Sequence, residues 1–362
     1  MAITLTDEMI KRSVANFGNP YRLSKLFSKA ERGEEITYVS IGGSITMGCN
    51  ASSENQYPKL IAKWLKDTFP NAKVNFVNAG IGATGSLIGL HRLQRDVLTH
   101  NPDFVTVEFS VNDNSTNPTS TLYYDNLLFN ILNSDTKPAV LAIGMFCPNG
   151  TSAQELHLPV AEHYGVPYIS VRDALYPEMK AGNMTWADYS NDDVHPINAG
   201  HIATVELVSD YLEGIMGREY EGDTPCDKHF TNDLYIDCEL VQSHTHTPKS
   251  FGAFAPAKTN VYMLPNGWRA EKNGDPIEFF IPSCRSVSML FERTNKGNGG
   301  KAVAVCEGKE ELLDADFKDG WGIYANNRTI FTSDVPRDVT LTVTPDLEEG
   351  KFFTLVAVMV AH

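Results

Sequence analysis

The segment Ile36-Thr-Tyr-Val-Ser-Ile-Gly-Gly-Ser44-Ile-Thr-Met passes from a run of β-branched and aromatic residues to two glycines and a hydroxyl side chain. A short continuous apolar run of this kind is typical of a strand that is buried on both faces. The glycines end the strand, and residues 57–69 follow with the period of a helix. The segment therefore indicates the start of a parallel α/β unit.

The same alternation of short apolar runs and helical periods continues on both sides of this segment, from residue 1 to about residue 216. It predicts a parallel sheet with helices on both faces. Further strands are predicted at 74–78, 103–110, 139–145 and 167–171. Helices are predicted from residue 4 or 6 to about 16, and at 20–33, 57–69, 86–98, near 151–164 and 197–215.

The helical period disappears after about residue 220. Six strands are predicted there, at 234–241, 277–281, 286–291, 301–306, 339–343 and 352–360, with turn clusters such as Asn273-Gly-Asp-Pro between them. Short strands with such turns predict a β-sandwich, of the jelly-roll kind. Because single cores rarely exceed about 250–300 residues, we predict two domains, residues 1–216 and 217–362.

The composition of the chain restricts its possible binding partners and its cellular compartment. The chain has 362 residues, with 30 Lys and Arg against 45 Asp and Glu, and a net charge of −15. This balance argues against nucleic acid or an anionic membrane as the main partner. No apolar stretch approaches the roughly 20 residues that span a bilayer, and the N-terminus lacks the regions of a signal peptide. With six cysteines and no Cys-x-x-Cys, we expect reduced thiols and a cytoplasmic location; a homo-oligomer is compatible with the sequence.

Four segments of the first domain contain clusters of polar residues. Three of them lie at the ends of predicted strands, and the fourth lies late in the domain. They are residues 42–46, 78–83, 110–113 and 192–196. In open α/β sheets, ligands bind beyond the carboxyl ends of the strands. We therefore expect the four segments to meet at one site.

These segments contain the residue types of acyl transfer. A serine hydroxyl becomes a useful nucleophile when a base removes its proton, and Ser44 and His195 are candidates for these two roles. A carboxylate must orient the imidazole. Asp192, three residues before His195, can lie on the same side of one turn, and Asp193 is the alternative.

The tetrahedral intermediate of acyl transfer needs hydrogen-bond donors for its oxyanion. The backbone N–H of Ser44, a backbone N–H from Gly82 or Ala83, and the side-chain amide of Asn112 can supply them. A turn-capping role is the alternative for Asn112, and helix capping is the alternative for Ser44.

The four blocks, taken in order, resemble those of the SGNH (GDSL-type) hydrolases, named for a Ser, a Gly, an Asn and a His. The resemblance spans about residues 36–215 and implies a flavodoxin-like three-layer fold. It also implies ester hydrolysis without a metal or an organic cofactor. Family spacing favours Asp192 over Asp193. Two positions depart from the pattern: Gly43 stands where the family usually has Asp, and the family's oxyanion glycine aligns with Ala83.

A β-sandwich after an SGNH domain is similar to the two-domain acetylesterases that deacetylate plant polysaccharides, notably gut-bacterial mannan esterases. That resemblance implies removal of O-acetyl groups from mannan- or xylan-derived oligosaccharides, with an accessory domain that helps to form the glycan cleft. Whether this domain serves its own active site or that of a neighbour stays open. The alternatives are an esterase or thioesterase for lipids or other acyl substrates, and a glycan-binding protein without activity.

Three aromatic residues of the second domain, Trp268, Trp321 and Tyr324, are candidates for stacking on sugar rings, with ordinary packing as the alternative. Near the four blocks, Glu108 and Asp113 are interpreted as structural and Cys49 as a packed thiol. Arg92 either ties the loops together or forms a surface ion pair. His244 and His246 are two residues apart and could bind a metal from one strand face, but they lack a third metal ligand.

Overall fold

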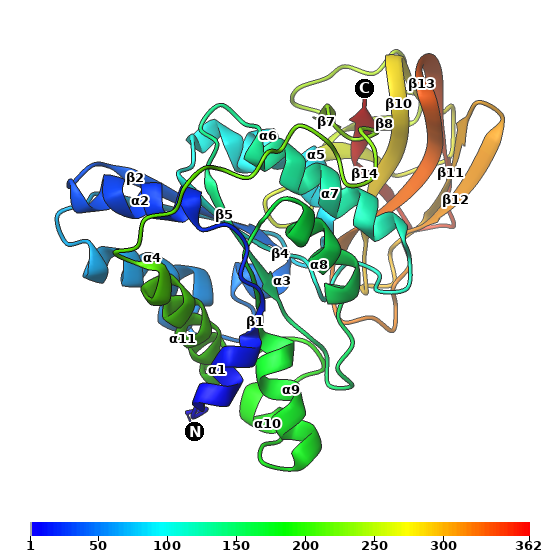
Figure 1. Cartoon of the computed structure of the whole chain (residues 1–362). Helices are drawn as coiled ribbons and strands as arrows, with labels where there is room; N and C mark the ends of the chain where they lie inside the picture. Colours follow the sequence, from blue (N-terminus) through cyan, green and yellow to red (C-terminus); the bar gives the residue numbers. More distant parts are fainter. Residues whose placement is uncertain (1) are drawn as a thin grey trace. The chain divides into compact units, whose positions relative to one another are not determined.

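The computed structural model describes residues 2–362, and its chain divides into two compact units, Met1–Asn232 and Asp233–His362. Figure 1 shows helices and strands alternating in the first unit, and strands alone in the second. An α/β unit followed by an all-antiparallel β unit is the predicted fold class.

Unit 1 consists of a sheet and eleven α-helices among its described residues. Its strands are β1 (Val14–Asn16), β2 (Ile36–Gly42), β3 (Val74–Gly80), β4 (Phe104–Glu108), β5 (Ala139–Gly144) and β6 (Tyr168–Ser170). Its helices are α1 (Asp7–Ser13), α2 (Tyr21–Glu31), α3 (Ser44–Met47), α4 (Tyr57–Thr68), α5 (Ser86–His91), α6 (Leu93–Asp96), α7 (Thr119–Leu132), α8 (Gln154–His163), α9 (Val171–Ala181), α10 (Trp186–Tyr189) and α11 (Asn198–Ile215).

The sheet has the order β1-β6-β5-β4-β2-β3, in which β2 to β6 are parallel and β1 is an antiparallel edge strand. Without β1 this is the flavodoxin-like order. The chain places β3 on one side of β2 and β4 on the other. A crevice forms where the strand order reverses in this way, at the carboxyl ends of the strands. The residues that follow β2, β3 and β4 therefore lie at the same edge of the sheet, where ligands bind in open α/β folds.

Helices cover both faces of the sheet because alternate strand residues point in opposite directions. Tyr38 and Leu141 belong to a core cluster with residues of α1, α2, α4, α9 and α11. Their strand neighbours Val39 and Ala142 are also fully buried, while α5, α7 and α8 contact the strands and one another. Burial on both faces accounts for the continuous apolar runs.

Most predicted elements of unit 1 exist, with three differences. The first helix is shorter than predicted: Thr6 caps α1 by accepting the Met9 N–H at 3.3 Å, and the chain continues as the edge strand β1. The helix predicted at 86–98 is broken at Arg92, between α5 and α6. Helices α3, α7, α9 and α10 were not predicted.

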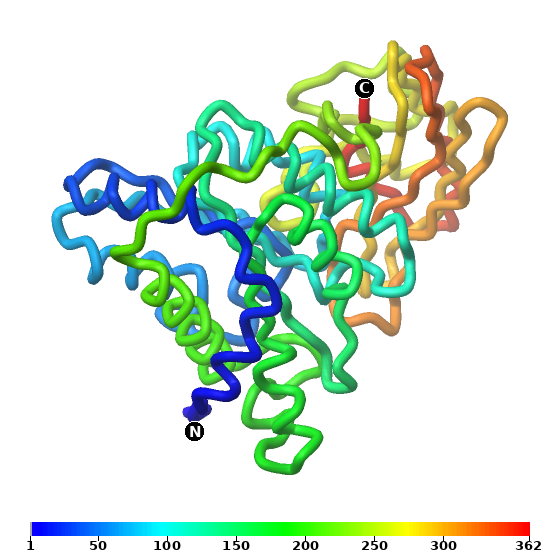
Figure 2. The backbone as a smooth tube through the Cα atoms, in the orientation of Figure 1, coloured from blue at the N-terminus to red at the C-terminus, as the bar shows by residue number. Residues whose placement is uncertain are grey.

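The predicted domain boundary at residue 216/217 lies too early, because residues 217–232 pack on unit 1. In Figure 2 this segment runs from the end of α11 across unit 1 towards α7 and α8. Arg22 binds Asp223 at 2.8 Å, and Asn133 donates to the Cys226 carbonyl at 3.0 Å. The polar, glycine-containing composition of the segment indicated a linker, but its backbone and side chains are bonded to helices far back in the sequence.

Unit 2 contains strands only, and all their pairings are antiparallel. The strands are β7 (Cys238–Val241), β8 (Phe254–Lys258), β9 (Asn266–Ala270), β10 (Ile277–Arg293), β11 (Lys301–Cys306), β12 (Lys309–Asp314), β13 (Tyr324–Asp346) and β14 (Phe353–Ala361).

Two long strands, β10 and β13, belong to both layers of unit 2. Residues 277–281 of β10 pair with 339–343 of β13, which also pairs with β11. Residues 286–291 of β10 pair instead with β14 on one side and the early part of β13 on the other. Register shifts between Ile281 and Ser288 separate the two parts. The sheet thus folds over on itself, which is a sandwich made from one continuous ladder.

A single core lies between the layers of this sandwich, and it includes Trp268 of β9, Ala304 of β11, Leu341 of β13 and Phe353 of β14. The strands predicted at 277–281 and 286–291 are the two parts of β10. Strands β8, β9 and β12 and the first half of β13 were not predicted.

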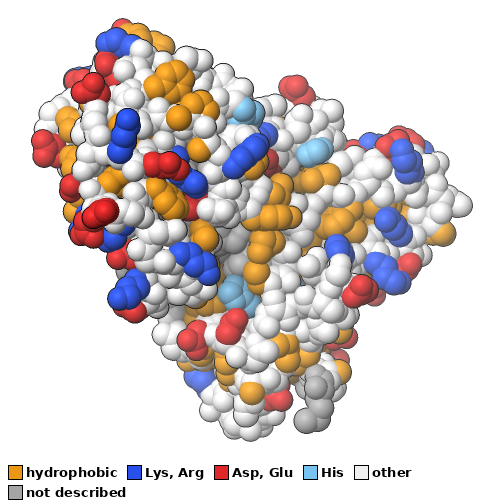
Figure 3. All heavy atoms as spheres, turned by 180° about the vertical axis from the view of Figure 1, so that it is seen from behind, with side chains coloured by type: hydrophobic (Ala, Val, Ile, Leu, Met, Phe, Trp, Pro, Cys, Tyr) orange, Lys and Arg blue, Asp and Glu red, His pale blue; other side chains and the backbone are white. Residues whose placement is uncertain are grey.

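No helix within residues 2–362 combines the length and the apolar character that a bilayer crossing requires. On the face shown in Figure 3, Lys and Arg side chains are interspersed with Asp and Glu, and the described residues form no continuous basic surface there. All six cysteines are free.

Candidate active site

Ser44 is the first residue of α3, directly after β2 and Gly43. Its side chain lies at the carboxyl end of the strand, and the residue is only 7% exposed. Asn112 follows β4, and its backbone N–H donates to the Phe109 carbonyl at 3.0 Å. The structure therefore places two of the predicted site residues on neighbouring strands, as the sheet order requires.

His195 and Asp192 reach Ser44 from the loop between α10 and α11. The Ser44 Oγ lies 2.8 Å from His195 Nε2, and His195 Nδ1 lies 2.8 Å from Asp192 Oδ2. Asp193 makes no contact with the imidazole among the described residues. The arrangement of hydroxyl, imidazole and carboxylate is the one that lets a histidine take a proton from a serine.

Asp192 is held in the ionised form that this arrangement requires. Burial raises the pKa of its carboxyl, but the backbone N–H groups of His195 at 2.6 Å and Val194 at 2.8 Å, with the His195 ring, lower it more. The net pKa is below the usual value. A second histidine nearby, His201, is buried, which lowers its pKa to about 4 and leaves it neutral at pH 7. Its Nδ1 accepts the Tyr57 N–H at 3.2 Å, whereas His195 is the histidine that contacts the Ser44 hydroxyl.

Three backbone donors near Ser44 are free to bind an oxyanion. The N–H groups of Ser44, Gly82 and Ala83 donate to no acceptor within residues 2–362. A methyl group placed on Gly82 would lie 3.9 Å from Ser44 Cβ, so Gly82 borders the hydroxyl. Ala83 has a φ of 56°, in the left-handed region that glycine prefers. Strain of this kind is often found at functional sites.

The side chain of Asn112 packs on Gly43. A methyl group on Gly43 would lie 2.0 Å from Asn112 Oδ1, which is buried and has no hydrogen-bond partner among the described residues. The amide nitrogen of Asn112 also donates to no protein acceptor there and can bind a ligand oxygen. The glycine at the position of the family's usual Asp thus makes room for this carboxamide.

Two charged residues are buried under the loops. Arg92 is fully buried and donates to the Gly42 and Ala79 carbonyls at 3.1 and 2.6 Å and to Asp96 at 3.1 Å. It therefore ties the ends of β2 and β3 together, which was one of its two predicted roles. Burial lowers its pKa to about 10, against the opposing effect of Asp96, so it is charged at pH 7. The second residue, Glu108, receives the Ser110 N–H and hydroxyl.

Asp113 joins the loop after β4 to the loop after β3, as expected for a structural residue. It accepts the Ser86 N–H at 2.8 Å and contacts His157 Nε2 at 2.9 Å. His157 stacks on Tyr124 with 3.8 Å between ring centroids. No sequence pattern indicated His157, because it lies on α8, 44 residues after Asp113.

The other candidates have more ordinary surroundings. Burial raises the pKa of the Cys49 thiol, and the charge of Asp192 adds to this effect, so the thiol stays protonated. His246 Nε2 lies 2.8 Å from Glu239. Among the described residues, no three His, Cys, Asp or Glu side chains are arranged to hold a metal ion.

The three aromatic candidates in unit 2 differ in exposure. Trp268 is fully buried in β9 and packs edge-on against Phe279, so the prediction that it contacts a substrate is wrong. Trp321 is 69% exposed and lies 5.2 Å from the Tyr324 ring, between centroids, with Phe317 beside both. Trp268 belongs to the core and Trp321 to the surface. The sequence alone does not reveal this difference in exposure.

Comparisons with known proteins agree with this architecture. The model of the GDSL-like lipase/acylhydrolase family matches residues 40–203. A crystal structure of a two-domain esterase (CEX) active on acetylated mannans is 30% identical, with a TM-score of 0.92 over 98% of each chain. A structure of such an esterase co-crystallized with mannopentaose gives the same identity and TM-score over 99% of each chain. Comparison with curated protein sequences finds no match.

The fold and these similarities define a carboxylic ester hydrolase with an SGNH catalytic unit and an antiparallel β unit. The chain belongs to the GDSL-like lipase/acylhydrolase family and is similar along its whole length to a two-domain esterase active on acetylated mannans.

Proposed function

We propose that the protein removes O-acetyl groups from acetylated oligosaccharides derived from mannan or xylan, with Ser44 as nucleophile. The observation that carries the proposal is the line of contacts from Ser44 Oγ through the His195 ring to Asp192, at 2.8 Å each. Full-length similarity to an esterase active on acetylated mannans supports the substrate class. Six free cysteines support work in a reducing compartment such as the cytoplasm.

The reaction proceeds through an acetylated Ser44. The Ser44 oxygen attacks the acetyl carbonyl while His195 Nε2 takes the hydroxyl proton, and Asp192 stabilises the imidazolium. Donors from Ser44, Gly82 or Ala83, and the Asn112 amide bind the oxyanion. His195 then protonates the departing sugar oxygen as its bond to carbon breaks. Water, deprotonated by His195, attacks the acetyl group and releases acetate and free Ser44.

The experiment is product analysis by NMR on acetylated mannan and xylan oligomers, together with 4-nitrophenyl esters of increasing chain length. We expect acetate release from the oligomers and a preference for two carbons over eight. Ser44→Ala should abolish both activities. A preference for eight carbons would favour a lipid or other acyl substrate, and binding without turnover would favour a glycan-binding protein. Full activity of Ser44→Ala would refute the mechanism.

We also propose that unit 2 binds glycan through Trp321 and Tyr324. The exposed Trp321 ring, supported by Tyr324, is suited to stacking on a sugar. Trp321→Ala should raise KM for acetylated oligomers several-fold without changing the hydrolysis of 4-nitrophenyl acetate. Tyr262→Ala, at another exposed aromatic residue of unit 2, is the control and should leave both unchanged.

A further inference from the structure

The loop that follows α3 is bonded directly to the loop that carries His195. Asn50 Nδ2 donates to the His195 carbonyl at 2.8 Å and to Asn191 Oδ1 at 2.5 Å. Two residues later, the Ser52 N–H donates to Asn198 Oδ1 at 2.8 Å. Asn50 is six residues after Ser44, so its side chain links the segment of the hydroxyl to the segment of the imidazole.

The backbone of Asn50 is left-handed, and this conformation by itself does not require a carboxamide side chain. Asn50 has a φ of 69°, in the left-handed region, just after the left-handed Gly48 that ends α3. Glycine adopts this conformation with less strain than any other residue. A turn alone would therefore be served at least as well by glycine, whereas the bond to His195 requires the carboxamide.

A second donor to the same carbonyl holds the loop internally. The Ser190 hydroxyl donates to the His195 carbonyl at 2.6 Å, and its oxygen accepts the Asp192 N–H at 3.1 Å. Ser190 thus shapes the loop around the imidazole and carboxylate. It makes no contact with the segment of Ser44 among the described residues, and the bond from Asn50 is the one that sets the distance between the two segments at His195.

We propose that Asn50 is a positioning residue that holds His195 within bonding distance of Ser44 during catalysis. The inference rests on the proposed function of Ser44 and His195. His195 must take a proton at Ser44 and deliver it to the leaving oxygen, so its ring has to stay aligned through both steps. A misplacement of about 1 Å in such an arrangement can reduce the rate by about 100-fold.

The test is Asn50→Gly, which keeps the left-handed backbone and removes only the donor. We expect kcat for 4-nitrophenyl acetate to fall about 10- to 100-fold. KM should change less than twofold, and the melting temperature by less than about 2 °C. Asn101→Gly is the matched control, because Asn101 is also left-handed, with a φ of 49°, and follows a 3₁₀ turn outside the four blocks. It should leave kcat unchanged. Unchanged kcat in Asn50→Gly would overturn the proposal.

A readout that does not depend on the ester substrate separates this inference from the proposed function. A fluorophosphonate probe reacts with a serine that is activated by a histidine, and its rate of labelling at Ser44 should fall in Asn50→Gly as kcat does. Equal labelling rates in the two proteins would overturn the inference. A third outcome is also possible: the probe labels Ser44 of the wild type and labels Asn50→Gly more slowly, but neither protein releases acetate from any oligomer. This result would support the inference and reject the proposed substrate.

Discussion

Gly43 has no side chain at a position where a residue of the candidate site approaches closely. Its Cα faces the carboxamide oxygen of Asn112, which fills the space that a Cβ would take. The amide nitrogen on the other end of that carboxamide donates to no protein acceptor among the described residues, and we propose that it binds the oxyanion. The spacing of the blocks predicted Asn112 as a donor, but it did not explain why the preceding block contains Gly-Gly rather than Gly-Asp.

Gly43→Ala should displace Asn112, because the new methyl group would lie 2.0 Å from Asn112 Oδ1. Loss of one oxyanion donor typically lowers the rate by about 10²–10³-fold, and we expect kcat for 4-nitrophenyl acetate to fall by about this factor. Gly214→Ala, where a methyl group meets no atom within 4 Å, is the control and should keep full activity. Gly43→Ala with wild-type kcat would show that Asn112 binds no oxyanion.

Residue types, their spacing and the resemblance to the SGNH hydrolases together predicted one site containing Ser44, His195, Asp192 and Asn112. They are not enough for Asn50 or His157, whose partners lie far away in the chain. They also do not separate Trp268 from Trp321, because both are tryptophans near turn clusters, and burial depends on the finished sandwich.

At the scale of the elements, β4 carries a carboxylate into the interior. Glu108 is fully buried, and its Oε2 has no hydrogen-bond partner among the described residues. Burial raises its pKa to about 7, with a further increase from Asp113, while bonds from Ser110 lower it. The folded protein therefore binds a proton at Glu108 more tightly than the unfolded chain does.

This pKa predicts how stability depends on pH. Between the ordinary value of 4.5 and about 7, the folded state keeps a proton that the unfolded state has lost, so stability falls as the pH rises through this window. Between pH 5 and pH 8, the free energy of unfolding of the wild type should fall by about 2–3 kcal/mol more than that of Glu108→Gln. Urea unfolding of both proteins at pH 5, 6, 7 and 8 measures it. Parallel stability curves would show that Glu108 does not titrate in this range.

Some elements were predictable and others were not, for physical reasons. Strand β2 and helix α4 have clear patterns because one is buried on both faces and the other has one apolar side. Helix α7 has polar residues at buried positions, such as Asp125 and Asn126. Its apolar residues therefore do not repeat with the regular spacing of an amphipathic helix. In unit 2, the turn-like residues Pro265-Asn-Gly concealed the start of β9.

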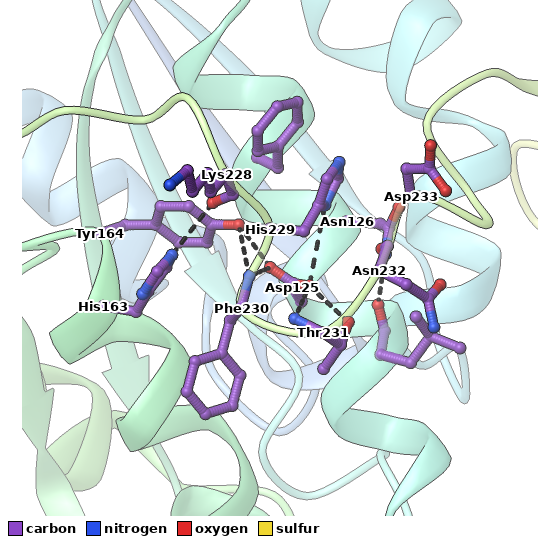
Figure 4. Close-up of polar contacts among 12 residues, drawn as sticks. Asp125, Asn126, His163, Tyr164, Lys228, His229, Phe230, Thr231, Asn232 and Asp233 are labelled. Atoms are coloured by element: carbon purple, nitrogen blue, oxygen red, sulfur yellow. Dashed lines mark hydrogen bonds and ion pairs between the residues drawn. The ribbon is translucent and has the colours of Figure 1, made fainter.

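At the scale of the whole molecule, the end of unit 1 depends on a buried carboxylate. Asp125 of α7 accepts the N–H groups of Phe230 and Thr231 at 3.1 and 2.7 Å, and it also binds the Tyr164 and Thr231 hydroxyls. Figure 4 shows these bonds holding residues 228–232 against α7 and the end of α8. Without this segment, the buried Asp125 carboxyl would lose most of its hydrogen-bond donors.

A chain that ends at Asn232 should therefore be more stable than one that ends at Met216. Removing partners from a buried charge typically costs about 3–5 kcal/mol. Thermal unfolding of the two truncated proteins, with yield of soluble material as a second measure, tests this expectation. Equal melting temperatures would mean that the 217–232 segment contributes nothing to unit 1, and that the boundary inferred from composition describes the folding unit better.

Strands β10 and β13 have a consequence for how unit 2 opens. Because each runs through both layers, neither layer can detach while the other keeps its ladder. Amide hydrogens of β11 and β14, on opposite sides of the core, should consequently exchange with deuterium through the same global opening and report the same free energy. We therefore expect the sandwich to open as one foldon rather than as two stacked sheets.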